Sequence, residues 1–184
     1  FYAILKTEVI MSDILQTLKE RRSCRKYKNE LIPQESLDKI LEAGTFAASG
    51  HGKQGAIIIA VTNKEARDKI SELNARIMGK TGVDPFYGAP EIIVVLADKS
   101  VPTYVYDGSL VLGNMMNEAE SLGVATCWIH RAKEVFESDE GKALLQKWGI
   151  EGDYEGVGNL AVGFAEAAKT KAAPRKENYI YYVK

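Results

Sequence analysis

The stretch EIIVVLA, residues 91–97, decides the fold, because it is an apolar run of strand length that is rich in branched residues. A similar run, AIIIAV at residues 56–61, predicts a second strand that is covered on both faces. Between the two runs, apolar residues recur at intervals of four and three positions and predict one face of a helix: Ala66, Ile70, Leu73 and Ile77. The turn-rich segment DPFYGAP connects this helix to the strand at 91–97.

Two further helices are predicted before this unit. In the segment 12–21, apolar residues at helical spacing are expected to be buried as one stripe, with Ser12 and Asp13 as the cap: Ile14, Leu15 and Leu18. The second helix is predicted to open at Pro33 and to end at Gly44. Its inner face carries Leu37, Ile40 and Leu41.

The second half of the chain continues the alternation. Residues 107–122 are apolar on most sides over their first ten positions, which predicts a central helix packed within the core and stopped by Gly123. A short extended piece at 124–130, a polar helix near 138–148 and a last strand at 159–165 precede a basic tail. By pattern alone, strands alternating with helices favour a three-layer α/β domain. Periodicity leaves the direction and order of the strands open.

Length and composition predict one soluble domain. The domain is expected to cover residues 11–184, with residues 1–10 as an N-terminal extension or a cloning remnant. The 25 acidic and 24 basic residues leave a net charge of -1, so no global field favours nucleic acid or an anionic membrane. No apolar run approaches the roughly 20 residues that span a bilayer, and the first ten residues lack the marks of a signal peptide. A cytoplasmic protein is therefore expected.

The cysteines and histidines predict no metal site. Cys24 and Cys127 are too few for a disulfide framework and suit a reducing compartment. With His51 and His130 they could supply four zinc ligands, but the paired spacings that are typical of zinc sites do not occur.

The segment RRSCRKY, residues 21–27, concentrates positive charge in a nearly neutral chain. Guanidinium groups offer planar, forked donors suited to phosphate oxygens, and a serine hydroxyl can add one more hydrogen bond. The segment could therefore bind a phosphate monoester through Arg21, Arg22, Ser23 and Arg25. Alternatively, one or two of these arginines only suit the negative end of the dipole of the preceding helix.

Two other segments could contribute to the same site. The tail carries a second basic cluster, which could converge on the same dianion or remain solvated: Lys169, Lys171, Arg175 and Lys176. The loop SGHGKQ, residues 49–54, has glycines that let the backbone approach a flat ligand. Because this loop precedes a strand, it is not a dinucleotide-binding fingerprint, and it could equally be an ordinary loop.

Taken in order, these segments resemble the nitroreductase family of flavin-dependent oxidoreductases. The matching pieces are Arg-Arg-Ser-x-Arg-x-Tyr at 21–27, IPQESLDKILEAGTFAAS, the glutamine of SGHGKQ, GAPEIIVV, NMMNEAESLGVATCWI, and VGF followed by Pro-Arg-Lys. The resemblance implies an α+β fold in which helices flank a central, mostly antiparallel sheet. It also implies an obligate, interlocked homodimer with FMN bound at the dimer interface.

The resemblance further implies which residues bind FMN. The phosphate-binding positions of the family fall on Arg21, Arg22, Ser23 and Arg25, with Arg175 and Lys176 closing from the tail. Ser49 and Gln54 match loop positions beside the flavin ring, and Asn74 matches an asparagine that can hydrogen-bond the polar edge of the ring. The backbone of Trp128, Ile129 and His130 falls where the family covers one side of the flavin.

One loop departs from the family pattern. The family commonly reads Pro-Ser-x-x-Asn-x-Gln-Pro-Trp, whereas this chain has other residues at four of those positions: Ala48, Gly52, Gly55 and Ala56. Because Gly52 stands at the asparagine position, one side-chain contact to the flavin is lacking.

The implied activity is a ping-pong transfer of reducing equivalents from NADH or NADPH to a nitroaromatic, quinone or similar small acceptor. The flavin carries the redox chemistry, so no catalytic side chain is predicted. A regulatory protein that holds flavin or another anion without turnover is the alternative. A nucleic-acid binder is disfavoured by the net charge of -1 and by the lack of a recognised binding motif.

Overall fold

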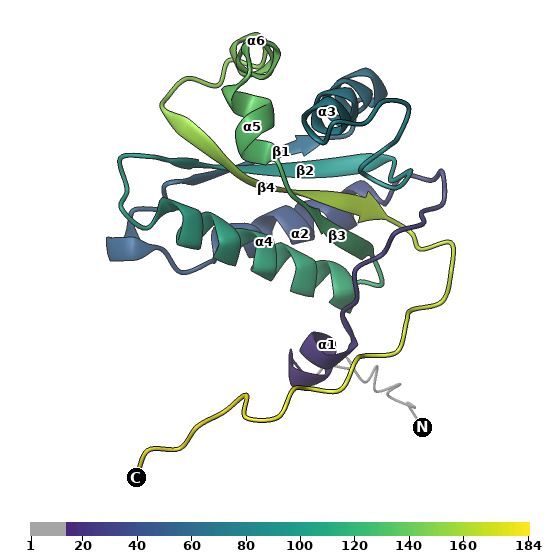
Figure 1. Cartoon of the computed structure of the whole chain (residues 1–184), viewed down its shortest axis with the longest axis vertical. Helices are drawn as coiled ribbons and strands as arrows, with labels where there is room; N and C mark the ends of the chain where they lie inside the picture. Colours follow the sequence, from purple (N-terminus) through teal and green to yellow (C-terminus); the bar gives the residue numbers. More distant parts are fainter. Residues whose placement is uncertain (1–13) are drawn as a thin grey trace, which may run out of the picture.

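A computed structural model describes residues 14–184, and within them four strands form one antiparallel sheet (Figure 1). The strands are β1 (Ala56–Val61), β2 (Glu91–Asp98), β3 (Ala125–Ile129) and β4 (Tyr154–Gly163). Their order across the sheet is β1-β2-β4-β3, and every neighbouring pair is antiparallel. The strands β1 and β3 therefore form opposite edges.

Helices cover both faces of the sheet (Figure 1). On one face lie α3 (Lys64–Ile77), α5 (Ala132–Glu137) and α6 (Asp139–Lys147); on the other lie α2 (Gln34–Thr45) and α4 (Tyr104–Ser121). The three layers match the pattern-based prediction, and the antiparallel sheet gives the α+β class that the family resemblance implied. Within residues 14–184, no helix is both long and apolar enough to cross a membrane.

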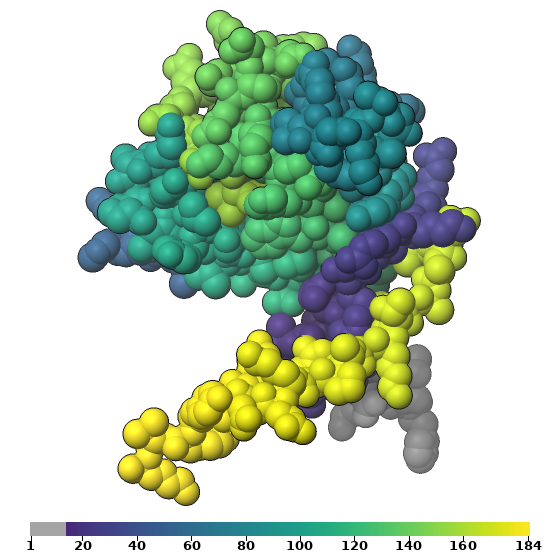
Figure 2. Space-filling model, viewed as in Figure 1, coloured from purple at the N-terminus to yellow at the C-terminus, as the bar shows by residue number. Residues whose placement is uncertain are grey.

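Both ends of the described chain lie outside these layers. Helix α1 (Ile14–Glu20) lies beyond α4, and the C-terminal segment passes close to it (Figure 1). After Ala165 the chain leaves the body as an extended arm, coloured yellow in Figure 2, and every residue from 166 to 184 is exposed.

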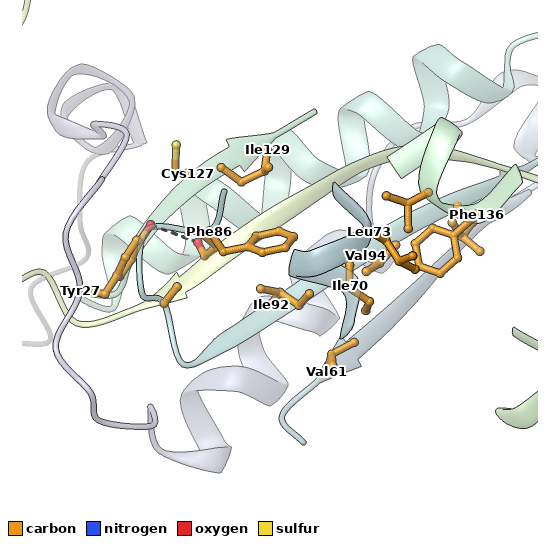
Figure 3. Packing of buried hydrophobic residues seen from close by; sticks show 14 residues of the cluster. Tyr27, Val61, Ile70, Leu73, Phe86, Ile92, Val94, Cys127, Ile129 and Phe136 are labelled. Atoms are coloured by element: carbon orange, nitrogen blue, oxygen red, sulfur yellow. Dashed lines mark hydrogen bonds between the residues drawn. The ribbon is translucent and has the colours of Figure 1, made fainter. Parts of the chain in front are cut away.

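The core is divided by the sheet into two apolar clusters, because side chains of β2 alternate between its faces. Ile92, Val94 and Leu96 face α3 and α5, where Phe86 and Phe136 join them (Figure 3). Ile93 and Val95 face α2 and α4 and contact Leu112, Met115 and Leu160 there. All eight residues of β2 except Asp98 are buried, which explains why the strand is apolar throughout its centre.

Helix α2 does not end at Gly44 as expected but continues to Thr45. Gly44 is buried inside the helix, where a Cβ atom would lie 2.8 Å from Ile58 Cδ1 and 2.9 Å from Met115 Cγ. This glycine therefore permits close packing of α2 on β1 and α4 rather than stopping the helix. The expected opening at Pro33 is correct, since Pro33 directly precedes the first helical turn.

Two expectations about burial are wrong. The stripe Ile14, Leu15 and Leu18 of α1 is at least half exposed, because α1 lies beyond α4 and away from the sheet (Figure 1). Strand β1 is not covered on both faces: most of its residues are half-buried and Ala60 is exposed, as its position at a sheet edge allows. The expected cap at Ser12 and Asp13, and the extension at 1–10, lie outside the described residues.

Element boundaries in the second half also differ from expectation. Helix α4 begins at Tyr104 rather than 107, and α5 was not expected at all. Strand β4 begins five residues before the expected 159. Glycines obscured this start: a Cβ atom at Gly156 would lie 2.3 Å from the backbone of Ala132, and one at Gly158 would lie 2.8 Å from the Trp128 ring.

Candidate functional site

The arginine segment runs along the β3 edge of the sheet. Ser23 forms a parallel bridge with Thr126, and the Cys24 amide donates to the Thr126 carbonyl at 2.9 Å. Further on, the Lys28 amide donates to the Phe164 carbonyl at 2.9 Å. These backbone bonds fix the segment that carries Arg21, Arg22, Ser23 and Arg25 beside β3 and the end of β4.

Arg22 has the helix-end role that was weighed for this segment. Its Nη2 atom donates to the Lys19 carbonyl at 2.7 Å, and its Nη1 atom donates to the Arg21 carbonyl at 2.5 Å, so the guanidinium caps the end of α1. Among the described residues, its buried Nε–H finds no hydrogen-bond partner. A buried donor without a partner is costly and is a sign of a site that takes an acceptor.

A cavity of about 360 Å³ opens beside this segment. Its basic wall consists of Arg22, Ser23, Arg25 and Lys26, and its other walls come from the start of β3 and the base of the arm, including Lys169. Lys169 forms an ion pair with Glu120, whose side chain is largely buried. The cavity thus combines a serine hydroxyl with several positive groups, the chemistry that binds a phosphate.

The remaining basic residues of the arm do not reach this cavity within the chain. Arg175 is exposed and donates to the Ala173 carbonyl at 2.7 Å, in its own segment. The Lys176 ammonium lies 5.2 Å from the centre of the Tyr179 ring. Arg175 and Lys176 are therefore exposed on the arm, and their recorded contacts lie within it.

The loop 49–54 lies at the opposite edge, next to β1. The Gly50 amide donates to both carboxylate oxygens of Asp107, at 3.1 and 3.2 Å, and the Thr103 hydroxyl donates to the same carboxylate at 3.0 Å. Inside the loop, the backbone N–H of Gln54 donates to Ser49 Oγ at 3.1 Å. His51 and Gln54 have positive φ angles of 52° and 50°, which are unusual for residues with side chains.

A second cavity, of about 540 Å³, lies against this loop. Ser49 and Gln54 contribute to it, together with small and apolar residues of α2, β1 and α4 and the buried carboxylate of Asp107. The sequence analysis missed Asp107. The only signal for it was an acidic residue at the start of an otherwise apolar helical stretch, DGSLVLG.

Two groups of predicted residues therefore lie at opposite edges of the sheet in the single chain. The arginine segment adjoins β3 and the loop 49–54 adjoins β1, and three strand intervals separate these edges. At about 4.8 Å for each interval, the edges are at least ~14 Å apart.

A third group holds the backbone at the end of β3. Asn74 is fully buried; its Nδ2 atom donates to the His130 carbonyl at 2.9 Å, and its Oδ1 atom accepts from Arg131 Nε at 2.9 Å. Asn159, which the sequence analysis missed, donates to the Ile129 carbonyl at 3.2 Å. Both polar atoms of the Asn74 side chain thus form hydrogen bonds within the chain. These bonds fix the segment 129–131, where Arg131 has a φ of 74°.

The side chains of the three predicted cover residues point in different ways. Ile129 is buried in the cluster under α3 and α5, whereas Trp128 is half-buried on the opposite face, against Gly158. His130 is exposed. The three residues could therefore contact one ligand together only through their backbone. Asn74 and Asn159 hold that backbone in place by hydrogen bonds.

Burial raises the pKa of two titratable groups in or next to the arginine segment, Cys127 and Tyr27. Burial raises the pKa of the Cys127 thiol, although Arg25 and a hydrogen bond from Ser23 oppose this shift. Burial also raises the pKa of Tyr27 well above its usual range, and the neighbouring cysteines add to the effect. Both groups are therefore uncharged at neutral pH.

Comparison with known proteins agrees with this geometry. Residues 18–164 match the sequence profile of the nitroreductase family. A nitroreductase with bound FMN from Bacteroides fragilis has the same fold with a TM-score of 0.86, at 28% identity and with 94% of this chain and 99% of that chain covered. A nitroreductase with bound FMN from Desulfitobacterium hafniense gives a TM-score of 0.82 at 29% identity, covering 95% of this chain and 100% of that one.

Among curated relatives, the FMN reductase [NAD(P)H] of Bacillus subtilis is 31% identical over 138 residues, which are 63% of this chain and 53% of that protein. The chain spans 62% of the length of a relative from Methanothermobacter thermautotrophicus. It therefore matches less than two thirds of either relative.

Proposed function

The chain belongs to the nitroreductase family, and on this premise we propose that it is an FMN-dependent oxidoreductase. It takes reducing equivalents from NADH or NADPH and passes them to a small acceptor such as a nitroaromatic or a quinone. The single observation that carries the proposal is the arginine cavity, with its convergent positive charge and its buried, unpartnered Arg22 Nε–H among the described residues.

The residues of the arginine cavity fit the phosphate of FMN. A phosphate monoester carries close to two negative charges and strong acceptor oxygens, which suit Arg22, Ser23 and Arg25. An acceptor oxygen near Arg22 Nε would supply the hydrogen bond that this buried donor lacks. Lys169 stays paired with Glu120, so its charge is partly balanced within the chain.

The rest of the binding site requires a homodimer in this proposal. Ser49 and Gln54 adjoin the opposite sheet edge from the arginines, so a second protomer would have to bring its loop to the first protomer's arginine cavity. The exposed arm supports this arrangement, because it carries Arg175 and Lys176 away from its own body and ends in a large apolar group: Tyr179, Ile180, Tyr181, Tyr182 and Val183. Exposed apolar residues of this kind favour burial against a partner.

Bound FMN would supply the hydride chemistry, and the residues of this chain would position it and control access. The arginine segment binds the phosphate end, and Asn74 and Asn159 hold the backbone of 129–131 in one conformation for the ring. Gly52, at the family's asparagine position, leaves open space where a side chain would stand. No side chain is assigned as a proton donor, since solvent can supply protons.

Arg25 tests the phosphate assignment directly. Arg25→Ala removes one charge-assisted contact, and we expect the Kd for FMN to rise about tenfold or more, as the loss of roughly 1.5–3 kcal/mol implies. Lys28→Ala is the matched control, because Lys28 is an exposed cation nearby that does not line the cavity. Equal FMN affinity in the Arg25 variant and the control would sink the assignment.

The alternative function is a regulatory protein that holds flavin without turnover. Steady-state oxidation of NADH and of NADPH with a quinone or a nitroaromatic separates the two functions. A ping-pong enzyme gives parallel double-reciprocal lines when both substrates are varied. Flavin binding without turnover of any reductant and acceptor pair would instead favour the regulatory alternative.

A further inference from the structure

The two cysteines of the chain lie side by side, although 102 positions of other sequence separate them. Ser23 and Thr126 form a parallel bridge, so Cys24 and Cys127 are the next residue in the same direction on each segment. The Cys24 amide also donates to the Thr126 carbonyl at 2.9 Å. Paired segments lie about 4.8 Å apart, which is within the roughly 4.4–6.8 Å that separates the Cα atoms of disulfide-bonded cysteines.

Tyr27 lies close to both cysteines, which supports their being neighbours in the core. The Tyr27 hydroxyl lies 3.2 Å from the Cys24 carbonyl and 3.3 Å from the carbonyl of Ala161, which is the partner of Cys127 in the sheet. Cys127 belongs to the same apolar cluster as Tyr27, and Cys24 packs against that cluster. Tyr27 and Cys127 lie at the same end of the cluster in Figure 3.

The two thiols differ in access. Cys24 is half-buried and lines the arginine cavity, whereas Cys127 is buried. Both thiols are free in this structure, with Cys24 Sγ 3.2 Å from the Lys26 carbonyl and Cys127 Sγ 3.7 Å from the Trp128 carbonyl. An oxidant entering the cavity therefore reaches Cys24 before the buried Cys127 on the neighbouring strand.

We propose that Cys24 and Cys127 form a reversible intrachain disulfide when the protein meets hydrogen peroxide. The Cys24 sulfur attacks one peroxide oxygen, the O–O bond breaks, and Cys24 sulfenic acid and one water form. The Cys127 sulfur then attacks the Cys24 sulfur, the S–O bond breaks, and a second water leaves with the thiol proton. Two electrons pass from the two thiols to one hydrogen peroxide, which yields one disulfide and two waters.

The disulfide would tie the arginine segment covalently to β3. It closes a loop of about 100 residues, for which restriction of the unfolded chain gives a large stabilisation. We expect the oxidised protein to melt roughly 5–10 °C higher than the reduced one. The proposal concerns only the two thiols and does not depend on the proposed flavin chemistry.

The test is mass spectrometry of the whole protein and of its peptides after treatment with hydrogen peroxide. We expect the loss of both free thiols, a mass decrease of about 2 Da for two lost hydrogens, and a cross-linked peptide containing Cys24 and Cys127. A thiol reductant should restore both thiols and the lower Tm. Persistence of both thiols, or oxidation of Cys24 to sulfinic acid with Cys127 still free, would overturn the proposal.

Two single variants separate this disulfide from other oxidation products. In Cys127→Ser, Cys24 has no resolving partner, so its sulfenic acid should accumulate and react with dimedone. In Cys24→Ser, the buried Cys127 should remain a thiol under the same treatment. A disulfide-linked dimer in the wild-type protein, formed in place of the intrachain link, would assign Cys24 to an intermolecular reaction and contradict the proposal.

Discussion

At the scale of single residues, the ionised form of Glu91 destabilises the folded state, because its carboxylate is buried. It is only 3% exposed at the start of β2, and its Oε2 atom accepts one hydrogen bond, from the Ile32 amide at 2.9 Å. Burial raises its pKa, and the Ile32 amide offsets the shift only in part. The folded state therefore holds this proton more tightly than the unfolded state, so the contribution to stability is present below the unfolded pKa and is lost as pH rises through the folded pKa.

Glu91→Gln should remove this pH dependence. The glutamine amide keeps an oxygen that can accept from the Ile32 amide, and it never ionises. We therefore expect the difference in unfolding free energy between variant and wild type to shift in favour of the variant from pH 4 to pH 8. Glu151→Gln, at an exposed position, is the control and should leave the pH dependence unchanged. Urea unfolding at both pH values measures the difference. An identical pH dependence in wild type and Glu91→Gln would contradict the assignment.

Arg67 is the opposite case, a buried charge whose partners are all supplied. Its Nε atom donates to the Ala89 carbonyl at 2.9 Å, its guanidinium pairs with Asp84 and Asp68, and it lies 5.5 Å from the Phe86 ring centre. Although burial alone would raise the pKa of Asp84, hydrogen bonds from Arg67, Ser71 and the backbone hold it below its usual range.

Arg67→Ala should therefore destabilise the fold strongly, by about 3 kcal/mol, because it leaves Asp84 partly buried without its cation. Arg76→Ala on the same helix is the matched control: its ion pair with Glu140 is half-exposed on both sides, and its loss should change stability little. Denaturant midpoints compare the two variants. Equal effects would show that the Arg67 network is not a structural anchor.

At the scale of elements, the loop 49–54 depends on α4. The carboxylate of Asp107 accepts the Gly50 amide and the Thr103 hydroxyl, and it holds a loop in which two residues other than glycine have positive φ angles. A Cβ atom at Gly50 would lie 2.2 Å from Thr103 Oγ1, so loop and helix are in close contact.

Asp107→Ala should release this loop without unfolding the domain. We expect amide hydrogen exchange in residues 49–54 to accelerate about tenfold, as the loss of a hydrogen-bonded carboxylate worth roughly 1.5–3 kcal/mol implies. Asp107→Asn keeps one acceptor oxygen and should have an intermediate effect. Unchanged exchange in 49–54 in both variants would show that Asp107 does not hold the loop.

The elements that could be predicted from the sequence are those whose pattern reflects their own packing. The alternating contacts of β2 and most of the inner face of α3 follow from their apolar residues: Ile70 and Leu73 are fully buried. Ile77, predicted on the same face, is exposed at the end of the helix. The first half of β4 was missed because it contacts the backbone of α5 through Gly156, which no hydrophobic pattern records. Helix α5 was missed although Ala132, Val135 and Phe136 are buried, because its six residues are too short for a helical period to stand out. Ile14, Leu15 and Leu18 do form an apolar face of α1, but the core of this chain does not bury them.

At the scale of the whole molecule, the sequence marked candidate site residues but not how the fold groups them. Charge alone marked the arginine segment, and the family resemblance marked Ser49, Gln54 and Asn74. The division of these residues between opposite sheet edges follows from strand order, which periodicity does not contain. Asp107 and Asn159 were missed because each is one polar residue in an apolar segment, with no spacing that marks its role.

The arm gives a prediction for the assembly. Deleting residues 169–184 removes Lys169, Arg175 and the apolar end, and we expect the variant to lose both dimer and FMN. Deleting only 179–184 keeps the basic residues and should weaken the dimer more than the contact to phosphate. Analytical ultracentrifugation and flavin content measure the two effects. A monomer of full stability that retains FMN after the longer deletion would contradict the interface proposed here.

The central claim, that this chain is an FMN-dependent oxidoreductase, is tested most directly by the visible absorption spectrum of the purified protein. The spectrum is followed anaerobically through addition of NADH, then NADPH, then a quinone acceptor, and the released chromophore is identified by mass. We predict an FMN band that bleaches with at least one of the two reductants and returns with the acceptor. A colourless protein that cannot be loaded with FMN would contradict the claim and would mean that the arginine cavity holds another anion.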